Sequence, residues 1–156
     1  MSQSYIEMLE GDQLVRNAPG ERHEIICARL HDRVAGSLGA NSAARLLPPR
    51  TKIPIAASTF IRPDLAVVTV ATGKLWLAAE IISSDDHHTD TVDKKVIYED
   101  INVPRLWMID PRYDNVEVYH CTAYGLALKH ILATREILQE TLLPDFQYII
   151  AELFAQ

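Results

Sequence analysis

A single carboxylate inside an apolar strand constrains this chain of 156 residues more than any other feature. Glu80 interrupts residues 75–82, whose other side chains are all apolar, and this pattern predicts a strand that is buried on both faces. An unpaired carboxylate in such a strand costs several kcal/mol of folding free energy. A neighbouring group must therefore neutralise Glu80.

The preceding segment brings a second carboxylate into register with Glu80. Residues 65–70 favour a β-strand, and the connection to the next strand ends in Gly73, which suits the left-handed last position of a three-residue hairpin loop. With that loop, Asp64 lies directly opposite Glu80 on the same face, with Cβ atoms about 5 Å apart. A two-residue loop would instead shift the register by one and put the two carboxylates on opposite faces.

Two carboxylates placed in this way repel each other unless a cation lies between them. Mg²⁺ and Mn²⁺ prefer oxygen ligands, so we expect Asp64 and Glu80 to share a divalent metal ion. An alternative needs no metal: Asp64 caps a turn after Pro63, and Glu80 pairs with an arginine.

A long helix is predicted before this hairpin. Residues 21–38 carry apolar side chains near helical spacing, and Gly39 suits the end of the helix. His23 and Glu24 lie in its first turn, where a carboxylate also suits the helix dipole. A helix packed beside the sheet could add either residue to the metal site.

A second helix is predicted after the hairpin, from about residue 90 to residue 101. Asp90, Lys94 and Tyr98 are spaced four apart and therefore share one face. Lys94 could point back toward the carboxylates, where a lysine orients or deprotonates a water molecule or stabilises charge on a phosphate. Asp90 is an accessory candidate for the same site.

The loop that precedes this helix, residues 83–89, is rich in Asp and His. His87 and His88 are adjacent and splay apart, and no Cys or spaced His completes a tetrahedral set of zinc ligands. We therefore interpret the loop as solvated.

The other elements predict an α/β protein of the α+β type, with a mixed sheet flanked by helices. Residues 5–15 predict a short helix or an extended entry, with a turn at residues 10–12. The patterns then predict an interrupted edge strand within 43–55, strands over 105–109, 116–122 and 126–132, and a closing amphipathic helix after Pro144. The order does not alternate regularly and contains no phosphate-binding glycine loop, and both observations argue against a dinucleotide-binding fold.

The composition is that of an ordinary globular protein. With no long apolar run and no basic segment followed by an apolar one at the start, we expect one cytoplasmic domain over residues 1–156 without a membrane segment. The net charge is −6, but residues 1–62 carry eight basic and six acidic side chains, so this half could approach a phosphate backbone. Cys27 and Cys121 have no metal or redox spacing.

Four motifs follow one another along the chain: Arg62-Pro63-Asp64, Glu80-Ile81-Ile82-Ser83, Asp90-x-x-x-Lys94-x-x-x-Tyr98 and Val103-Pro104-x-x-Trp107-x-x-Asp110-Pro111. In this order and spacing they resemble the Uma-two family of restriction-endonuclease-like proteins, which belongs to the PD-(D/E)xK nuclease superfamily. The resemblance also covers the region of Gly11, the Ala18-Pro19 pair with His23, and residues 144–154.

The resemblance implies a restriction-endonuclease-like core in which Asp64 and Glu80 bind Mg²⁺. The superfamily lysine normally lies two residues beyond the glutamate, where this chain has Ile82. In this family the lysine lies on the following helix, and the resemblance assigns it to Lys94. Lys94 keeps the spacing to Asp90 and Tyr98, whereas Lys95 does not. Two conformational positions depart from the family pattern, with Ser84 in place of a proline and Asn102 in place of a glycine.

We therefore predict an endonuclease that depends on Mg²⁺ or Mn²⁺ and hydrolyses DNA, with Asp64, Glu80 and Lys94 as its catalytic residues. A homodimer would allow such an enzyme to cut both strands of a duplex. One alternative is a non-catalytic nucleic-acid-binding or regulatory module with the same fold. Another is a homodimeric interaction protein in which the acidic pair holds a structural ion.

Overall fold

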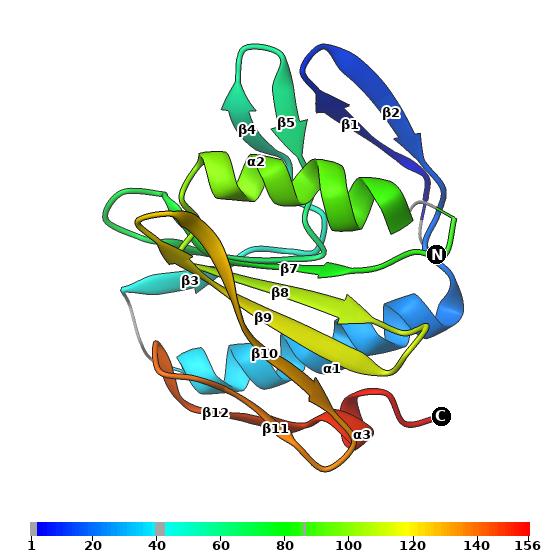
Figure 1. The fold of residues 1–156 in the computed structure, drawn as a ribbon, viewed down its shortest axis with the longest axis vertical. Helices are drawn as coiled ribbons and strands as arrows, with labels where there is room; N and C mark the ends of the chain where they lie inside the picture. The colour runs from blue at the N-terminus through cyan, green and yellow to red at the C-terminus, as the bar shows by residue number, and fades with distance from the viewer. Residues whose placement is uncertain (1–2, 40–42, 86) are drawn as a thin grey trace.

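A six-stranded mixed sheet forms the centre of the protein in the computed structural model, which describes residues 3–39, 43–85 and 87–156 (Figure 1). Its strands are β3 (Ala44–Leu46), β6 (Leu65–Thr69), β7 (Leu75–Ile81), β8 (Arg105–Asp110), β9 (Asn115–Thr122) and β10 (Gly125–Ala133). They lie side by side in the order β10-β9-β8-β7-β6-β3. The strands β7 and β8 are parallel, and the other neighbours are antiparallel. The predicted mixed sheet is confirmed.

Helices cover the two faces of this sheet. The helix α1 (Glu21–Leu38) lies against one face, and the π-helical turn η1 (Thr89–Asp93) followed by α2 (Lys94–Asp100) lies against the other (Figure 1). Buried side chains of α1, among them Leu30 and Val34, form one core cluster with the α1-facing side of β7 and β8. Tyr98 of α2 belongs to a second cluster on the opposite face. Because β7 is covered on both sides, its apolar composition is explained.

A smaller four-stranded sheet lies beyond α2, in the order β2-β1-β5-β4 (Figure 1). It consists of β1 (Tyr5–Leu9), β2 (Asp12–Arg16), β4 (Ile53–Ala56) and β5 (Thr59–Ile61). The turn between β1 and β2 holds Glu10 and Gly11 at φ 51° and 87°, and positive φ at two successive residues is the conformation that matches the twist of a tight hairpin. The extended alternative for residues 5–15 is therefore confirmed, and the helical one is wrong.

The C-terminal segment differs from the prediction. It forms a hairpin of β11 (Ile137–Glu140) and β12 (Leu143–Ile149), and only α3 (Ile150–Leu153) is helical. Phe146, Tyr148 and Ile150 are buried, whereas Gln147 between the first two is exposed. This spacing of two residues belongs to a strand, so the predicted amphipathic helix is wrong.

The pairing of β6 with β7 is confirmed at the end that holds Asp64, although the loop is not. Leu65 pairs with Ala79, as predicted, so the next position along places Asp64 opposite Glu80. At the other end Val68 pairs with Leu75, and the loop contains four residues instead of three. An extra residue in β7, Trp76, forms a bulge that restores the predicted register.

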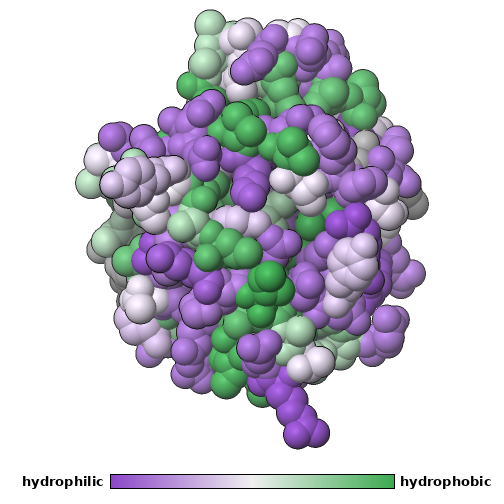
Figure 2. Space-filling view, viewed as in Figure 1, coloured by the Kyte–Doolittle hydropathy of each residue, from purple (hydrophilic) through white to green (hydrophobic). Residues whose placement is uncertain are grey.

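The surface facing the viewer is a mixture of hydrophilic and hydrophobic residues (Figure 2). The exposed apolar side chains of the protein include Leu128 and Ile131 of the edge strand β10. Within the described ranges, no helix is both long enough and apolar enough to cross a membrane.

Candidate active site

Asp64 lies just before β6 and is buried. Its Oδ2 accepts a hydrogen bond from the backbone amide of Ile81, at 2.8 Å, and lies 3.4 Å from Nε2 of His23. Its Oδ1 accepts a hydrogen bond from Nη1 of Arg50, at 3.2 Å. The carboxylate thus links the residue before β6 to the end of β7 by a hydrogen bond, and it does not cap a turn after Pro63.

Glu80 is also buried, in β7, and it contacts the helix that covers its face of the sheet. Its Oε1 accepts a hydrogen bond from the hydroxyl of Tyr98, at 2.5 Å, and lies 2.5 Å from Nζ of Lys94. The alternative without a metal paired Glu80 with an arginine, but its partner is a lysine. Both contacts use Oε1, so neither of them occupies Oε2.

The predicted common face of Asp90, Lys94 and Tyr98 is confirmed, because all three side chains are buried. The π-helical turn that begins at Thr89 closes on Lys94, whose backbone amide bonds to the carbonyl oxygen of Thr89. Turns of this kind are rare and occur often at functional sites. Lys94 therefore reaches the sheet from the helix, although it lies fourteen residues beyond Glu80 in the sequence.

Two further residues of the site come from the N-terminal hairpin, and the sequence pattern did not predict them. Glu7 of β1 lies between Nη1 of Arg16, at 2.6 Å, and Nζ of Lys94, at 2.8 Å. Glu7 also accepts a hydrogen bond from the backbone amide of Arg62. Arg16 of β2 in turn binds Asp90, at 2.7 Å. A buried chain of alternating charges thus links the small sheet to the helix that carries Lys94.

The accessory candidates of α1 lie on the opposite side of Asp64 from this chain. His23 lies between Asp64 and Glu24. Its Nε2 is 3.4 Å from Oδ2 of Asp64, and its Nδ1 is 3.4 Å from Oε1 of Glu24. Glu24 binds Nη2 of Arg50 at 2.9 Å, and Arg50 returns to Asp64. The first turn of α1 therefore positions Asp64, which gives Glu24 a contact beyond its favourable place on the helix dipole.

The pKa values of the two central carboxylates, Asp64 and Glu80, are shifted in opposite directions. Burial alone would raise the pKa of Asp64, but the hydrogen bond and charge of His23, the amide of Ile81 and the charge of Lys94 outweigh burial and lower the pKa to about 2. For Glu80, burial and the negative charges around it outweigh Lys94 and raise the pKa to about 8. Asp64 is therefore ionised at neutral pH, whereas the ionised form of Glu80 is disfavoured unless more positive charge is present.

The buried charges of the site fit a divalent cation. Four carboxylates are buried there, those of Glu7, Asp64, Glu80 and Asp90, against only two buried cations, Arg16 and Lys94. Half-buried Arg50 brings its second partner Glu24 with it and leaves this difference unchanged. With Glu80 ionised, the buried carboxylates outnumber Arg16 and Lys94 by two, and His23 beside Asp64 offsets one of these charges when it is protonated. A divalent cation would supply the further positive charge that favours ionised Glu80, and carboxylate oxygens are the ligands that Mg²⁺ and Mn²⁺ prefer.

A metal ion would have only two protein side chains at this position. Within residues 3–39, 43–85 and 87–156, no three His, Cys, Asp or Glu side chains are arranged to hold a metal ion. Mg²⁺ commonly binds through one or two carboxylates and completes its shell with water and substrate phosphates, so the pair remains a suitable site. Among the same described residues, no zinc site is found near His87 and His88. Asp86 of that loop lies outside the described residues.

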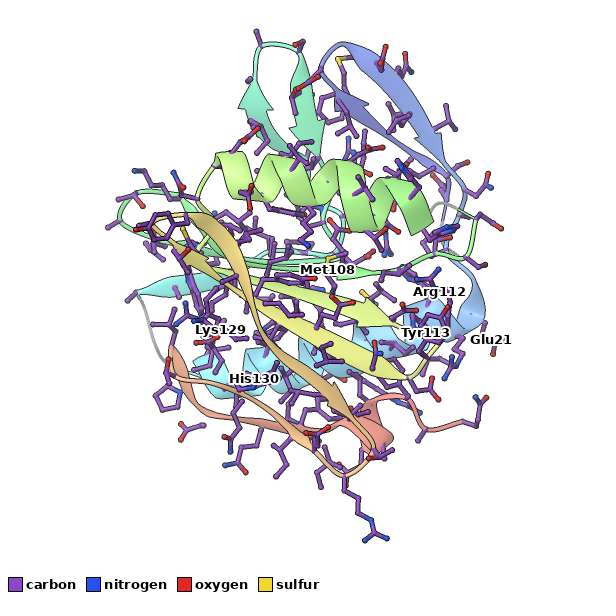
Figure 3. All side chains as sticks on the ribbon, in the orientation of Figure 1. Glu21, Met108, Arg112, Tyr113, Lys129 and His130 are labelled. Carbon is purple, nitrogen blue, oxygen red and sulfur yellow. The ribbon has the colours of Figure 1, made fainter. Side chains whose placement is uncertain are left out.

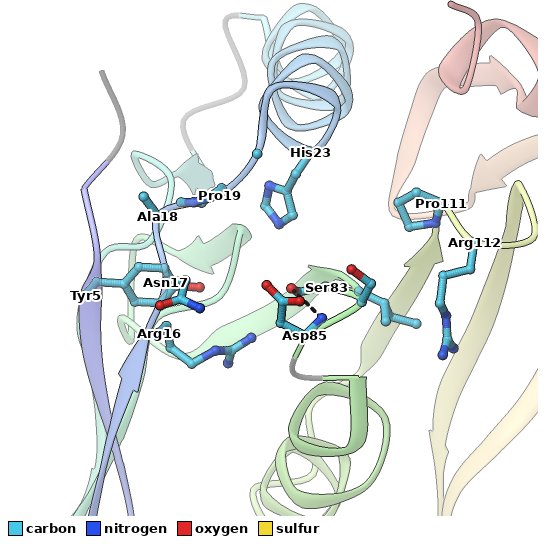
Figure 4. Close-up of a pocket in the computed structure, with 13 residues that line it drawn as sticks. Tyr5, Arg16, Asn17, Ala18, Pro19, His23, Ser83, Asp85, Pro111 and Arg112 are labelled. Carbon is cyan, nitrogen blue, oxygen red and sulfur yellow. Dashed lines mark hydrogen bonds between the residues drawn. The ribbon is translucent and has the colours of Figure 1, made fainter.

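A pocket of about 430 Å³ opens beside the buried carboxylates. Figure 4 shows Tyr5 on one wall, His23 above the space, Ser83 and Asp85 below it, and Arg112 on the far wall. These residues come from β1, the first turn of α1, the segment after β7 and the segment after β8. The ring of His23 joins the pocket to Asp64, so a ligand in the pocket lies next to the candidate catalytic residues.

The mixed sheet with helices on both faces has the arrangement of a restriction-endonuclease-like fold. A sequence model of the family Uma2, described as "Putative restriction endonuclease", matches residues 2–152, and the chain therefore belongs to this family. The resemblance inferred from the four motifs is confirmed.

One solved structure shares this fold over almost the whole chain. It is the crystal structure of "a putative nuclease belonging to DUF820 from Anabaena variabilis ATCC 29413", with a TM-score of 0.80 and 16% sequence identity. The similarity covers 96% of this chain and 89% of the other. The comparison with curated proteins gives no match.

Proposed function

We propose that this protein is a divalent-metal-dependent nuclease that hydrolyses DNA phosphodiester bonds at Asp64, Glu80 and Lys94. One observation carries the proposal: Lys94 of the helix reaches to within 2.5 Å of Glu80, and the sheet register places Asp64 opposite that glutamate. Three buried charged residues from three segments thus meet beside a pocket. Carrying them there costs folding free energy, which favours a functional role.

The carboxylates would hold the metal ion. Asp64 is ionised at neutral pH, and Glu80 has its Oε2 atom free of the lysine and tyrosine contacts. Held between them, Mg²⁺ or Mn²⁺ would act as a Lewis acid that stabilises negative charge on the phosphate oxygens. Tyr98 fixes the orientation of Glu80 through Oε1, and Ile81 and Arg50 fix that of Asp64.

Lys94 would act as a cation. Burial alone would lower its pKa, but the negative charges of Glu80, Glu7 and Asp90 outweigh burial and raise the pKa above its ordinary value. A protonated lysine donates hydrogen bonds and cannot accept a proton. Of the roles predicted from the sequence, we therefore favour orientation of the attacking water and stabilisation of transition-state charge over deprotonation.

Cleavage assays with matched variants test this proposal. Plasmid DNA and short oligonucleotides are incubated with wild type, Asp64→Asn and Glu140→Gln in the presence of Mg²⁺ or Mn²⁺. Glu140→Gln is the control, because Glu140 is also a buried carboxylate but pairs with Arg105 away from the site. We expect wild type and Glu140→Gln to cleave, and Asp64→Asn to lose more than about 100-fold in rate.

Cleavage by Asp64→Asn at the wild-type rate would contradict the assignment of the site. DNA binding by a wild-type protein that cleaves nothing would favour the non-catalytic module instead. The homodimer and the cytoplasmic location remain predictions from the sequence.

A further inference from the structure

The arginines around the pocket are already bound to carboxylates. Arg16 and Arg112 line the pocket, and Arg16 binds Glu7 and Asp90 while Arg112 binds Asp110 at 2.9 Å. Arg22, in the first turn of α1, binds Asp114 at 2.8 Å. The arginines beside the pocket thus pair with carboxylates of the protein itself, and they add little net positive charge to the pocket.

A duplex would need more positive charge than this region supplies. Much of the affinity of a protein for double-stranded DNA comes from lysine and arginine side chains that neutralise its phosphates. Here the chain carries a net charge of −6, and the exposed side chain of Asp85 lies in the pocket wall. Exposed Glu21 lies at the same side of the molecule as Arg112 (Figure 3). These carboxylates would repel the second strand of a duplex.

The size and the chemistry of the pocket suit a single nucleotide. Its volume of about 430 Å³ falls in the range of small-molecule sites, which is about 300–1,000 Å³. Tyr5 offers a half-buried ring on one wall (Figure 4), with the guanidinium of Arg16 5.9 Å from the centre of that ring. Asn17, Ser83 and Ser84 add neutral hydrogen-bonding groups. Aromatic stacking of this kind binds single-stranded bases with little sequence preference.

We infer that the substrate of this site is single-stranded DNA, one nucleotide of which occupies the pocket and stacks on Tyr5. This inference rests on the proposed nuclease function. A nucleotide in the pocket lies against His23, whose Nε2 lies 3.4 Å from Oδ2 of Asp64, so the adjoining phosphodiester bond would lie near the carboxylate pair. A duplex presents its bases inside the helix and cannot place one in the pocket unless that base is extruded.

The inference is tested by binding and cleavage with paired substrates. A fluorescent oligothymidylate and a duplex of the same length are titrated with wild-type protein in Ca²⁺, at low and at physiological salt. Both substrates are then tested for cleavage in Mn²⁺. We expect the single strand to bind at least about tenfold more tightly than the duplex at both salt concentrations and to be cleaved faster.

Three variants assign the binding to the pocket. Tyr5→Leu removes the ring, and we expect it to weaken binding of the single strand by about 5- to 100-fold. Tyr5→Phe keeps the ring and should recover most of this loss, which separates stacking from misfolding. Tyr124→Leu is the control, because Tyr124 is fully exposed in the turn between β9 and β10 and does not line the pocket.

The outcomes separate this inference from the function on which it rests. If the duplex is bound and cleaved as well as the single strand, the inference is overturned while the nuclease proposal stands. If Tyr5→Leu binds the single strand as tightly as wild type, the pocket is not the nucleotide site. If wild type neither binds nor cleaves either substrate, both proposals fail.

Discussion

The Nζ atom of Lys94 lies 2.8 Å from Oε2 of Glu7, and both side chains are completely buried. Glu7 belongs to the N-terminal hairpin, whereas Lys94 begins α2, and the two meet over the face of the sheet that holds Glu80. The lysine is therefore fixed between two carboxylates from different elements. Removing either partner leaves an uncompensated charge inside the protein.

Lys94→Met should destabilise the protein strongly. The substitution leaves Glu7 and Glu80 without their common cation, and breaking a buried ion pair costs about 3–5 kcal/mol. Lys95→Met is the matched control. Lys95 lies over the ring of Tyr119 and is only partly buried, so its loss should cost less than about 1 kcal/mol. The free energies of unfolding in urea measure both, and equal losses would contradict the buried network.

Glu7 and Lys94 should also be energetically coupled. In a double-mutant cycle of Glu7→Gln and Lys94→Met, we expect the double variant to be more stable than the sum of the two single losses predicts, by at least about 1 kcal/mol. The reason is that the second substitution removes a charge that the first has already left unpaired. Strictly additive losses would show that the two side chains do not interact in solution.

The stability of the metal-free protein should fall as the pH rises. Burial first, and then the charges of Asp64, Glu7 and Asp90, raise the pKa of Glu80 from 4.5 to about 8. The folded protein therefore holds this proton more tightly than the unfolded chain, and the resulting stability is full below pH 4.5 and is lost as the pH rises through 8. We expect Tm in EDTA to fall across this window, and to fall less in Glu80→Gln.

Two neighbours define the controls for this pH dependence. The pKa of Asp64 is lowered to about 2, so its contribution is present above 3.8 and is lost only as the pH falls through 2, outside the window. The pKa of His23 is raised, because Asp64 outweighs burial, and its contribution is lost at higher pH in the same sense as that of Glu80. The fall that persists in Glu80→Gln should therefore be smaller in Glu80→Gln/His23→Gln, and what is left is the contribution of Asp90, whose pKa burial also raises. An unchanged Tm profile in Glu80→Gln would contradict the raised pKa.

Two glycines should respond to alanine in opposite directions. Gly125 has φ 109°, and a Cβ there would lie 2.6 Å from Oε2 of Glu99, so Gly125→Ala should destabilise the protein by more than about 1 kcal/mol. Gly36 is an exposed position of α1 with no atom within 4 Å of an added Cβ, so Gly36→Ala should stabilise it by about 0.5–1 kcal/mol. Thermal unfolding of both variants checks the signs, and a stabilising Gly125→Ala would show that the turn has a different backbone.

The pattern of apolar residues was sufficient to predict the elements around the site. The long helix begins and ends at the predicted residues, Glu21 and Leu38, and the strand after Pro104 begins as predicted. The spacing of Asp90, Lys94 and Tyr98 predicted their common face, although nothing in the sequence indicates the π-helical turn at Thr89. Local periodicity carries this information because each element buries its own apolar face.

Residues whose partners lie far away in the sequence could not be placed in this way. The sequence does not show that β1 pairs with β5, where Met8 lies opposite Phe60. Without that pairing, the side chain of Glu7 could not be predicted to point into the protein. Its ion pair with Lys94 depends in addition on where α2 packs. The register of Asp64 with Glu80 was predicted correctly from a loop that is one residue too short, because the bulge at Trp76 compensates.

Calorimetric titration with Mn²⁺ and Mg²⁺ tests the central claim most directly. Wild type, Glu80→Gln and the distant control Glu140→Gln are compared at neutral pH in the absence of DNA. We expect wild type and Glu140→Gln to bind the ion and Glu80→Gln not to bind it, and we expect binding by wild type to release protons as Glu80 ionises. A wild-type protein that binds neither ion, or a Glu80→Gln variant that binds as tightly as wild type, would contradict the shared cation of Asp64 and Glu80.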